Sequence, residues 1–226
     1  MTNLIELLQH QHLVWQGSAQ VAPKATTTGF TELDEHLAGG FHTTGVTEIQ
    51  SESGVGELRL LMPVLVEAKV QQRLIVFIAP QGLISAQALA AQGIELDKVL
   101  TIYPKDQQQA LWTAEQCLRS GACHSVLMWS YQALEIHHVK RLQVASETGN
   151  CRQFILREGK AESLSLPFDL SLSLQTHAKG VTVKINKRKC GWPSEAFHIN
   201  MVDRWPSLTQ QALPDNLIPF PQVQTG

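Results

Sequence analysis

The chain of 226 residues lacks the patterns by which several protein classes are recognised. Its 4 cysteines are scattered without a C-x-x-C pair, which argues against a zinc site or a disulfide framework and favours thiols in a reducing cytoplasm. Its 9 histidines include no H-E-x-x-H motif. No apolar run reaches roughly 18 residues, and the first residues do not form a signal segment. We therefore expect a cytoplasmic protein without a membrane span.

Charge of either sign is also scarce. Charged residues make up 17% of the chain, apolar residues make up 43%, and the formal net charge is -2. This composition is typical of a globular protein with fewer charges than usual. It implies no overall attraction to nucleic acid. The length allows one large domain with appendages.

A segment that follows an apolar run at residues 45–49 has the place of a phosphate-binding loop without its chemistry. In the P-loop pattern G-x-x-x-x-G-K-[ST], the lysine holds phosphate and the hydroxyl group holds Mg²⁺. Here Ser51 stands at the first glycine and Gly56 keeps the second, while Glu57 and Leu58 replace the lysine and the hydroxyl residue. A negative charge therefore stands where a cation would bind phosphate.

A plain strand-to-helix turn explains the same residues. Gly54 and Gly56 supply a permissive backbone, and Glu57 is an acidic residue in a first helical turn, where it interacts well with the helix dipole. We expect no cofactor, no metal and no catalytic residue, and we interpret the protein as a non-enzyme.

Strand and helix patterns alternate along most of the chain. Continuous apolar runs typical of strands covered on both faces lie at 74–79 and 125–129, and further strands are predicted at 45–49, 99–103 and 151–156. Helices are predicted at 31–37, 57–71, 85–92, 106–120 and 135–148, with Pro63 expected to kink the second or limit its first turn. Residues 170–176 and 181–186 alternate in period two and predict a hairpin. The fold class is α/β, with a mostly parallel sheet flanked by helices and a C-terminal antiparallel hairpin.

Three regions are distinguished by composition. Residues 1–27 are predicted to form an N-terminal helix and a linker, residues 28–205 the core, and residues 206–226 a tail interrupted by prolines. We expect the tail to be extended, or ordered only on a partner.

The order of segments resembles the core of RecA-type recombinases. Residues 28–34 read T-G-F-T-E-L-D and precede Gly39-Gly40, as at the entry of that family, and residues 93–100 and 110–121 resemble two later segments. A narrower resemblance, over residues 54–61, 78–80 and 110–123, is to the ImuA family of RecA-like proteins of SOS mutagenesis. The SulA family of SOS cell-division inhibitors is a close relative of the same shape.

The resemblance allows the reaction centre to be tested at three positions. In RecA proteins a loop lysine binds phosphate, a glutamate after the next strand activates water, and an aspartate ends a later strand near Mg²⁺. These positions are Glu57, the segment at Gln81, and Trp129 in this chain. Because phosphoryl transfer depends on charge at all three places, the resemblance implies that ATP is not hydrolysed.

The resemblance to ImuA implies a non-enzymatic adaptor in translesion DNA synthesis, whose partners are the polymerase-like protein ImuB and RecA. Two alternatives remain open. One is a SulA-type inhibitor of cell division that binds the tubulin-like protein FtsZ, and the other is an atypical RecA-like ATPase.

Candidate partner-binding residues lie near both ends of the chain. They are apolar side chains of the amphipathic N-terminal segment or of the proline-broken C-terminal segment. The residues are Leu4, Leu7, Leu8, Trp205, Leu213, Leu217 and Phe220. Apolar anchors in such segments are typical of protein interfaces, and the alternative is that they pack back onto the core. Lys187, Arg188 and Lys189 form a basic strand end that can contact phosphates, with Trp192 placed to stack on a base; a solvated strand end is the alternative.

Overall fold

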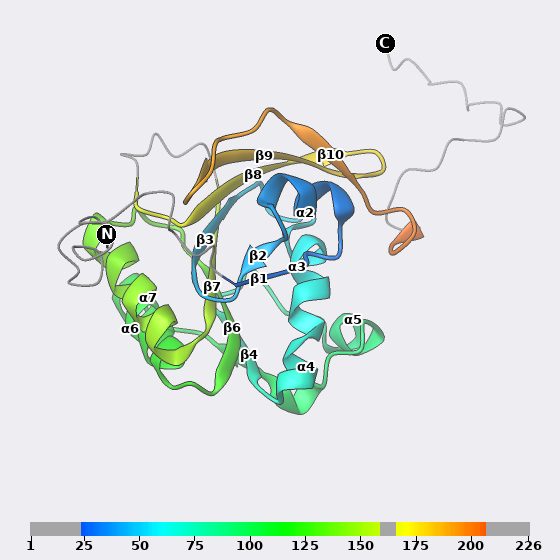
Figure 1. The fold of residues 1–226 in the computed structure, drawn as a ribbon. Helices are drawn as coiled ribbons and strands as arrows, with labels where there is room; N and C mark the ends of the chain where they lie inside the picture. Colours follow the sequence, from blue (N-terminus) through cyan, green and yellow to red (C-terminus); the bar gives the residue numbers. More distant parts are fainter. Residues whose placement is uncertain (1–23, 159–165, 207–226) are drawn as a thin grey trace, which may run out of the picture.

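A computed structural model describes residues 24–158 and 166–206, and these form a mixed sheet with helices on both faces (Figure 1). The strands of the large sheet are β3 (Gly45–Gln50), β4 (Leu74–Ile78), β5 (Val99–Ile102), β6 (Cys123–Trp129), β7 (Arg152–Arg157), β8 (Leu170–His177), β9 (Gly180–Arg188) and β10 (Phe197–Asn200). Their order across the sheet is β10-β9-β8-β3-β7-β6-β4-β5. The strands from β8 to β5 run parallel to their neighbours, and β9 runs antiparallel to β8 and β10. The expected mostly parallel sheet with an antiparallel end is therefore confirmed.

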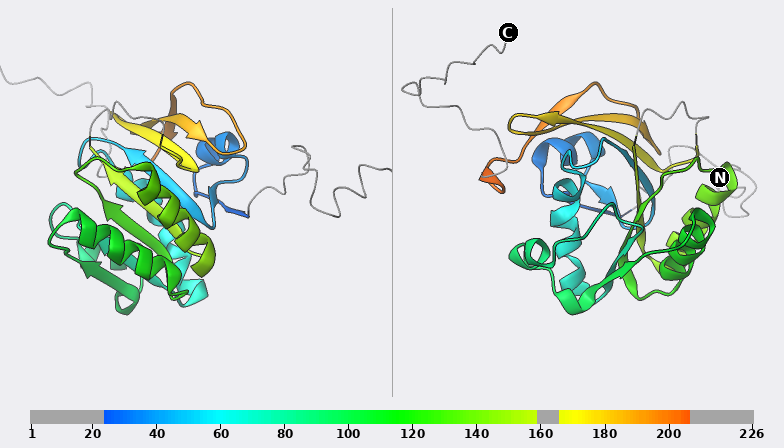
Figure 2. Two further views of the ribbon diagram at one scale, coloured as in Figure 1. Left: turned by 90° about the vertical axis from the view of Figure 1, so that its left-hand side faces the viewer. Right: turned by 180° about the vertical axis from the view of Figure 1, so that it is seen from behind.

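The helices divide between the two faces of the sheet (Figures 1 and 2). They are α2 (Thr31–Leu37), α3 (Glu57–Val66), α4 (Ala68–Gln71), α5 (Ala86–Ala91), α6 (Gln107–Arg119) and α7 (Ile136–Gly149), with a short 3-10 helix at Leu96–Lys98. The apolar sides of α2, α3 and α5 share one core with the sheet, while α6 and α7 share a second core on the other face. This two-sided burial explains why β4 and β6 are almost continuously apolar.

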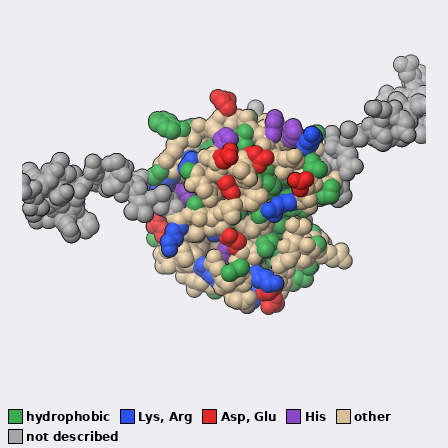
Figure 3. All heavy atoms as spheres, turned by 45° about the vertical axis from the view of Figure 1, so that its right-hand side comes forward, with side chains coloured by type: hydrophobic (Ala, Val, Ile, Leu, Met, Phe, Trp, Pro, Cys, Tyr) green, Lys and Arg blue, Asp and Glu red, His purple; other side chains and the backbone are tan. Residues whose placement is uncertain are grey.

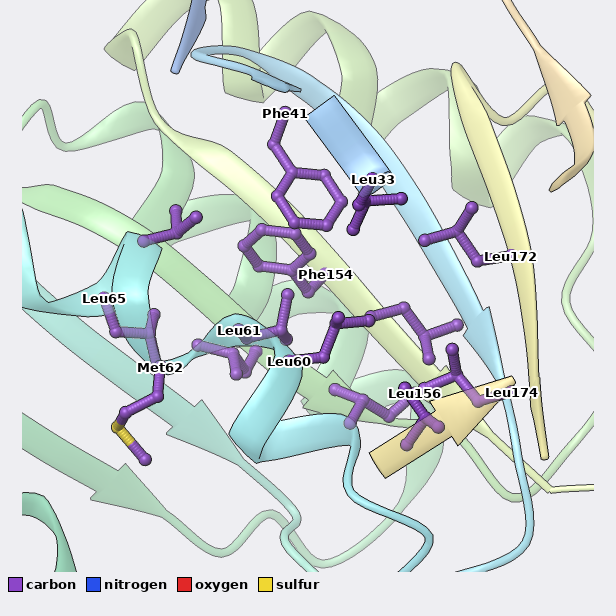
Figure 4. Close-up of a cluster of buried hydrophobic side chains, with 14 of the residues drawn as sticks. Leu33, Phe41, Leu60, Leu61, Met62, Leu65, Phe154, Leu156, Leu172 and Leu174 are labelled. Carbon is purple, nitrogen blue, oxygen red and sulfur yellow. The ribbon is translucent and has the colours of Figure 1, made fainter. Parts of the chain in front are cut away.

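The first core is centred on two phenylalanines and the leucines of α2 and α3 (Figure 4). Phe41 and Phe154 meet edge to face with ring centroids 5.4 Å apart. Leu33 and Leu60 are fully buried against them. Because a buried side chain of this size contributes roughly 1.5–3 kcal/mol, this core fixes α3 against the sheet directly after the candidate loop.

Helix starts follow the capping residues in the sequence. Asp106 accepts a hydrogen bond from the Gln109 N–H at 2.7 Å, which confirms it as the N-cap of α6. Ser85 caps α5 in the same way through the Ala88 N–H at 3.2 Å. These local bonds explain why both helix starts could be predicted.

The helix predicted over residues 57–71 is divided in the structure. Pro63 lies inside α3 rather than in its first turn, and α3 ends at Val66, with Glu67 between α3 and α4. Proline supplies no N–H for the helical hydrogen bond, so helical pairing is weakened around it.

Three short strands were not predicted. β1 (Ala25–Thr26) pairs with β2 (Phe41–His42) and lies in the segment expected to be a linker. β10 follows β9 and pairs with it antiparallel. Its alternation of Phe197, Ile199 and Met201 with polar residues carries a period-two signal that could have revealed it.

A buried histidine occupies the amino end of β6. His124 is 2% exposed, its Nδ1 is 2.9 Å from the Ser125 hydroxyl, and its Nε2 has no hydrogen-bond partner among the residues that the structure describes. Burial, followed by the charges of Arg152 and Arg73, lowers the pKa of His124 to about 3. His124 is therefore neutral in the folded protein at neutral pH.

This pKa predicts a loss of stability in mild acid. Between about pH 6.5 and pH 3 the unfolded chain binds a proton at His124 and the folded chain does not, so stability falls as pH falls through this window. We expect His124 to lower the free energy of unfolding by about 2 kcal/mol at pH 5 relative to pH 7. Urea unfolding at both pH values, compared with His124→Phe, measures this difference. Equal pH dependence in the two proteins would show that His124 titrates normally.

Candidate functional site

The candidate site lies at the carboxyl ends of parallel strands, where open α/β sheets bind ligands. The loop after β3 meets the ends of β4, β6 and β7 there. Because these strands are parallel, their carboxyl ends lie at one edge of the sheet, and Glu57, Gln81 and Trp129 lie close together. A small crevice between them is lined by Ser51, Ser53, Glu57, Gln81, Trp129, Ser130, Tyr131, Leu156, Arg157 and Glu158. Glu57, Gln81 and Trp129 thus line the same crevice.

The backbone N–H groups of the loop are capped by the side chain of Glu57. The Glu57 carboxylate accepts hydrogen bonds from the Gly56 N–H at 3.0 Å and from the Gly54 N–H at 3.3 Å. Both glycines have positive φ, 81° at Gly54 and 125° at Gly56, so the turn depends on them. Glu57 is 9% exposed. The protein's own carboxylate therefore accepts hydrogen bonds from backbone N–H groups of the kind that bind phosphate in an anion site.

The other residues of the pattern also have structural roles. Leu58, at the position of the metal-binding hydroxyl, packs against the first core. Ser51, at the first glycine position, continues the pairing of β3 with β7 through its N–H and the Arg157 carbonyl, 3.1 Å apart. The alternative of a plain strand-to-helix turn accounts for both.

The opposite side of the crevice is lined by an indole and by polar groups, Arg157 and Glu158 among them. Trp129 is 7% exposed, and its ring lies 6.2 Å from that of Phe77, so an indole fills the position of the expected carboxylate. The Gln81 amide donates to Glu158 at 2.9 Å, and the Tyr131 hydroxyl donates to the Ala79 carbonyl at 3.1 Å. These polar groups bind one another across the loops.

The crevice is also small. Its cavity volume is ≈ 10 Å³. Pockets for small ligands have roughly 300–1,000 Å³. A nucleoside triphosphate therefore needs movement of the loop as well as removal of the Glu57 carboxylate.

Sequence reasoning missed a buried ion pair beside the site. Glu48 in β3 is 2.9 Å from the Arg157 guanidinium at the end of β7, and its other oxygen accepts from the Ser171 hydroxyl at 2.6 Å and the Gln50 amide at 3.0 Å. The two charged side chains are 3% and 11% exposed. Glu48 alone gave no signal, because Arg157 and Ser171 come from strands that follow much later in the chain.

The predicted basic strand end is engaged within the protein. Lys187 donates to the Leu166 carbonyl at 2.8 Å, and Arg188 donates to the His36 carbonyl at 2.8 Å. Lys189 pairs with Asp169 at 3.2 Å, and that charge raises the pKa of Lys189. On the face in Figure 3, acidic and basic side chains are interspersed. These contacts favour a structural role for all three residues.

A wider groove lies along β3, β8 and β9. Its floor is the polar side of these strands, including Gln50, Ser173, Lys184 and Asn186. The Asn186 amide donates to Ser173 at 2.6 Å, so part of this floor is internally paired. An antiparallel edge commonly presents such a polar face to water.

Of the predicted partner-binding residues, only one lies in the described ranges. Trp205 is 9% exposed and stacks on Phe30 with ring centroids 6.5 Å apart, so for this residue the alternative of packing on the core is the observed one. The Trp205 N–H also donates to the Met201 carbonyl at 2.9 Å. The remaining ones, outside the described residues, are Leu4, Leu7, Leu8, Leu213, Leu217 and Phe220.

Two features are absent from residues 24–158 and 166–206. Over these ranges, no group of three His, Cys, Asp or Glu side chains is arranged to hold a metal ion. Likewise, none of the helices in them is long and apolar enough to cross a membrane.

Fold and site together define a mixed α/β protein whose phosphate-loop position lacks the phosphate-binding charge. Within it, residues 45–153 match the family model described as "Cell division inhibitor SulA". This segment runs from β3 into β7 and includes the candidate loop.

Similar proteins carry two names. The chain is 29% identical over 137 residues to the cell division inhibitor SulA of Serratia marcescens, covering 54% of this chain and 81% of that protein. It is 26% identical over 167 residues to the RecA protein of Clostridium acetobutylicum, covering 74% of this chain but 43% of that protein. A crystal structure of SulA from Pseudomonas aeruginosa matches with 28% identity and a TM-score of 0.43, covering 50% of this chain and 98% of that one. The chain thus spans less than half the length of its RecA relatives.

Proposed function

We propose that this protein is a non-enzymatic binding protein of the bacterial DNA-damage response. The observation that carries the proposal is the Glu57 carboxylate, which accepts hydrogen bonds from the loop N–H groups of Gly54 and Gly56. The similarity to SulA and RecA gives the biological setting, and the internally occupied loop favours action by contact with other proteins.

The first candidate role is inhibition of cell division by binding FtsZ. It is supported by the SulA family model over residues 45–153 and by the coverage of most of the Serratia marcescens SulA chain. In this role the body of the protein acts as a steric ligand, for which no nucleotide is needed.

The second candidate role is that of a translesion-synthesis adaptor that binds an ImuB-type protein and RecA. It is favoured by the extent of the RecA similarity, which covers 167 residues, whereas the SulA match ends at residue 153. Strands β8, β9 and β10 come after that point and complete the sheet. The residues after 206 then offer a segment for the second partner.

One experiment separates the two roles. The tagged full chain is recovered from cells before and after DNA damage, and its co-purifying proteins are identified while cell length is followed during overexpression. Enrichment of FtsZ together with filamentation supports division inhibition. Enrichment of an ImuB-type protein and RecA, without filamentation, supports the adaptor. A chain that binds none of these proteins contradicts both roles.

The Glu57 bonds predict a measurable capping effect. Replacing Glu57 with Ala leaves two loop N–H groups without their acceptor, so we expect the free energy of unfolding to fall by about 1 kcal/mol. Glu52→Ala is the matched control, because Glu52 is an exposed acid of the same loop. Urea unfolding of both variants tests this. Equal stability losses would show that the carboxylate does not cap the loop.

A further inference from the structure

Strand β5 lies at one edge of the large sheet, and among the described residues it pairs only with β4. The Ala79 N–H donates to the Ile102 carbonyl at 2.9 Å, so the backbone groups of Ile102 point towards β4. Because the backbone groups of successive strand residues point in alternate directions, those of Thr101 and Tyr103 point away from the sheet. This edge therefore presents backbone donors and acceptors that no described segment of the chain pairs.

The side chains at this edge are apolar. Residues 99–103 read V-L-T-I-Y and include no charge, glycine or proline. Native edge strands are commonly protected from pairing by charged side chains, proline or a bulge. Leu100 is 44% exposed and Tyr103 is 59% exposed, whereas β10, at the opposite edge, exposes His198 and Asn200. The β5 edge is thus better suited to a partner strand than to water.

The strand is complementary to itself when two copies run antiparallel with Thr101 opposite Thr101. The outward backbone groups of the two copies then face each other, and the Tyr103 N–H of one copy faces the Val99 carbonyl of the other. Leu100 lies opposite Ile102, which packs against the second core, and both point to the same face of the sheet. Pairs of aromatic and β-branched residues, such as Tyr103 with Val99, stabilise antiparallel strands.

The residues that flank the strand fit the same alignment. The Val99 N–H donates to the Leu96 carbonyl within the 3-10 helix, so the extended segment begins at Val99. Outside this segment, the exposed Asp97 and the exposed Lys105 each lie four residues from Thr101. Asp97 of each copy therefore stands opposite Lys105 of the other, and opposite charges meet at both ends of the pair. Parallel strands in register would place like charges together instead.

We propose that the protein forms a two-fold symmetric dimer with a second copy of this chain, through antiparallel pairing of β5 with β5 centred on Thr101. The two eight-stranded sheets then form one continuous sheet. The pairing gives partners to the outward backbone groups of Thr101 and Tyr103 and covers Leu100. It does not involve the Glu57 loop, so it can hold whether or not that loop binds a nucleotide.

Sedimentation velocity of the full chain tests the dimer. We expect the unchanged protein to sediment as a dimer and Leu100→Lys, which places a charge at the edge, to sediment as a monomer at the same concentration. Val70→Lys is the matched control, because Val70 is 87% exposed on α4, and it should keep the dimer. Far-UV circular dichroism shows that each variant is folded.

The alignment of the two strands is tested separately. Asp97→Lys should weaken the dimer, and adding Lys105→Asp should restore it, because opposite charges then meet again. In the Cys190→Ser protein, Thr101→Cys should form a disulfide between two copies under mild oxidation, since residues of a hydrogen-bonded antiparallel pair have Cα atoms about 5.5 Å apart, within the reach of a disulfide. Val144→Cys, at an exposed position of α7, is the control.

The proposal is overturned if the full chain is a monomer, if Leu100→Lys keeps the dimer, if the charge exchange fails to restore it, or if Thr101→Cys forms the disulfide no faster than Val144→Cys. Hydrogen exchange distinguishes another occupant of the edge. Slow exchange of the Thr101 and Tyr103 N–H groups in a monomer would show that another segment of the same chain covers β5, which also overturns the proposal.

Discussion

Replacing Arg157 with Met is expected to lower the free energy of unfolding by about 3–5 kcal/mol, because it leaves the Glu48 carboxylate buried without its cation. The two side chains are 2.9 Å apart and nearly inaccessible to water. The Ser171 hydroxyl and the Gln50 amide remain near Glu48, yet neither carries a compensating charge. Urea unfolding of the purified variant measures the loss.

An exposed ion pair is the matched control for this prediction. Lys69 and Glu95 lie 3.6 Å apart with side chains 57% and 33% exposed, so Lys69→Met should cost less than about 1 kcal/mol. The double variant Glu48→Leu with Arg157→Met should recover much of the loss, since no isolated charge is then buried. A small effect of Arg157→Met alone would mean that water reaches Glu48 in solution.

Replacing Gly149 with Ala is expected to destabilise the protein by about 3 kcal/mol through overpacking. Helix propensity alone predicts the opposite sign, a gain of about 1 kcal/mol for Gly to Ala within α7. However, a Cβ at this position would overlap the Leu118 carbonyl oxygen and lie 3.1 Å from the Gly121 nitrogen. The ends of α6 and α7 would have to separate.

Thermal or urea unfolding of Gly149→Ala shows whether the substitution destabilises or stabilises the protein. Lys140→Ala, at an exposed position of α7, is the control and should change stability by less than about 0.5 kcal/mol. Stabilisation by Gly149→Ala would show that the two helix ends are further apart than the structure places them.

Local chemistry made most of the fold predictable. Asp106 marks the start of α6 because its carboxylate bonds to the Gln109 N–H three residues on, and the apolar run of β6 reflects burial on both faces. The carboxyl ends of parallel strands share one edge, so Glu57, Gln81 and Trp129 could be expected to meet.

Long-range contacts account for what the sequence did not reveal. Arg157 comes 109 residues after Glu48, and no local pattern announces that they pair. Likewise, the aromatic residue Trp205 stands next to a proline-broken tail, and only the fold brings it against Phe30. The loop pattern exposed Glu57 as an unusual residue, but the hydrogen bonds it accepts from Gly54 and Gly56 required coordinates.

The loop keeps the position of a phosphate-binding loop but not its chemistry. The place of the loop after β3 is retained, and residues 45–153 still match the SulA model across it. Glu57, Gln81 and Trp129, which the resemblance to RecA proteins places at the positions of the groups that bind and activate a triphosphate, line one crevice. A single substitution is therefore not expected to create an ATPase.

The most direct test is calorimetric titration of the full chain with ATP and Mg²⁺, paired with a phosphate-release assay on the same sample and on Glu57→Lys. The loop closed by Glu57 predicts no binding heat for the original protein and no phosphate release above buffer from either protein. Micromolar binding with turnover by the original protein, or turnover gained by Glu57→Lys alone, would contradict a non-enzymatic site.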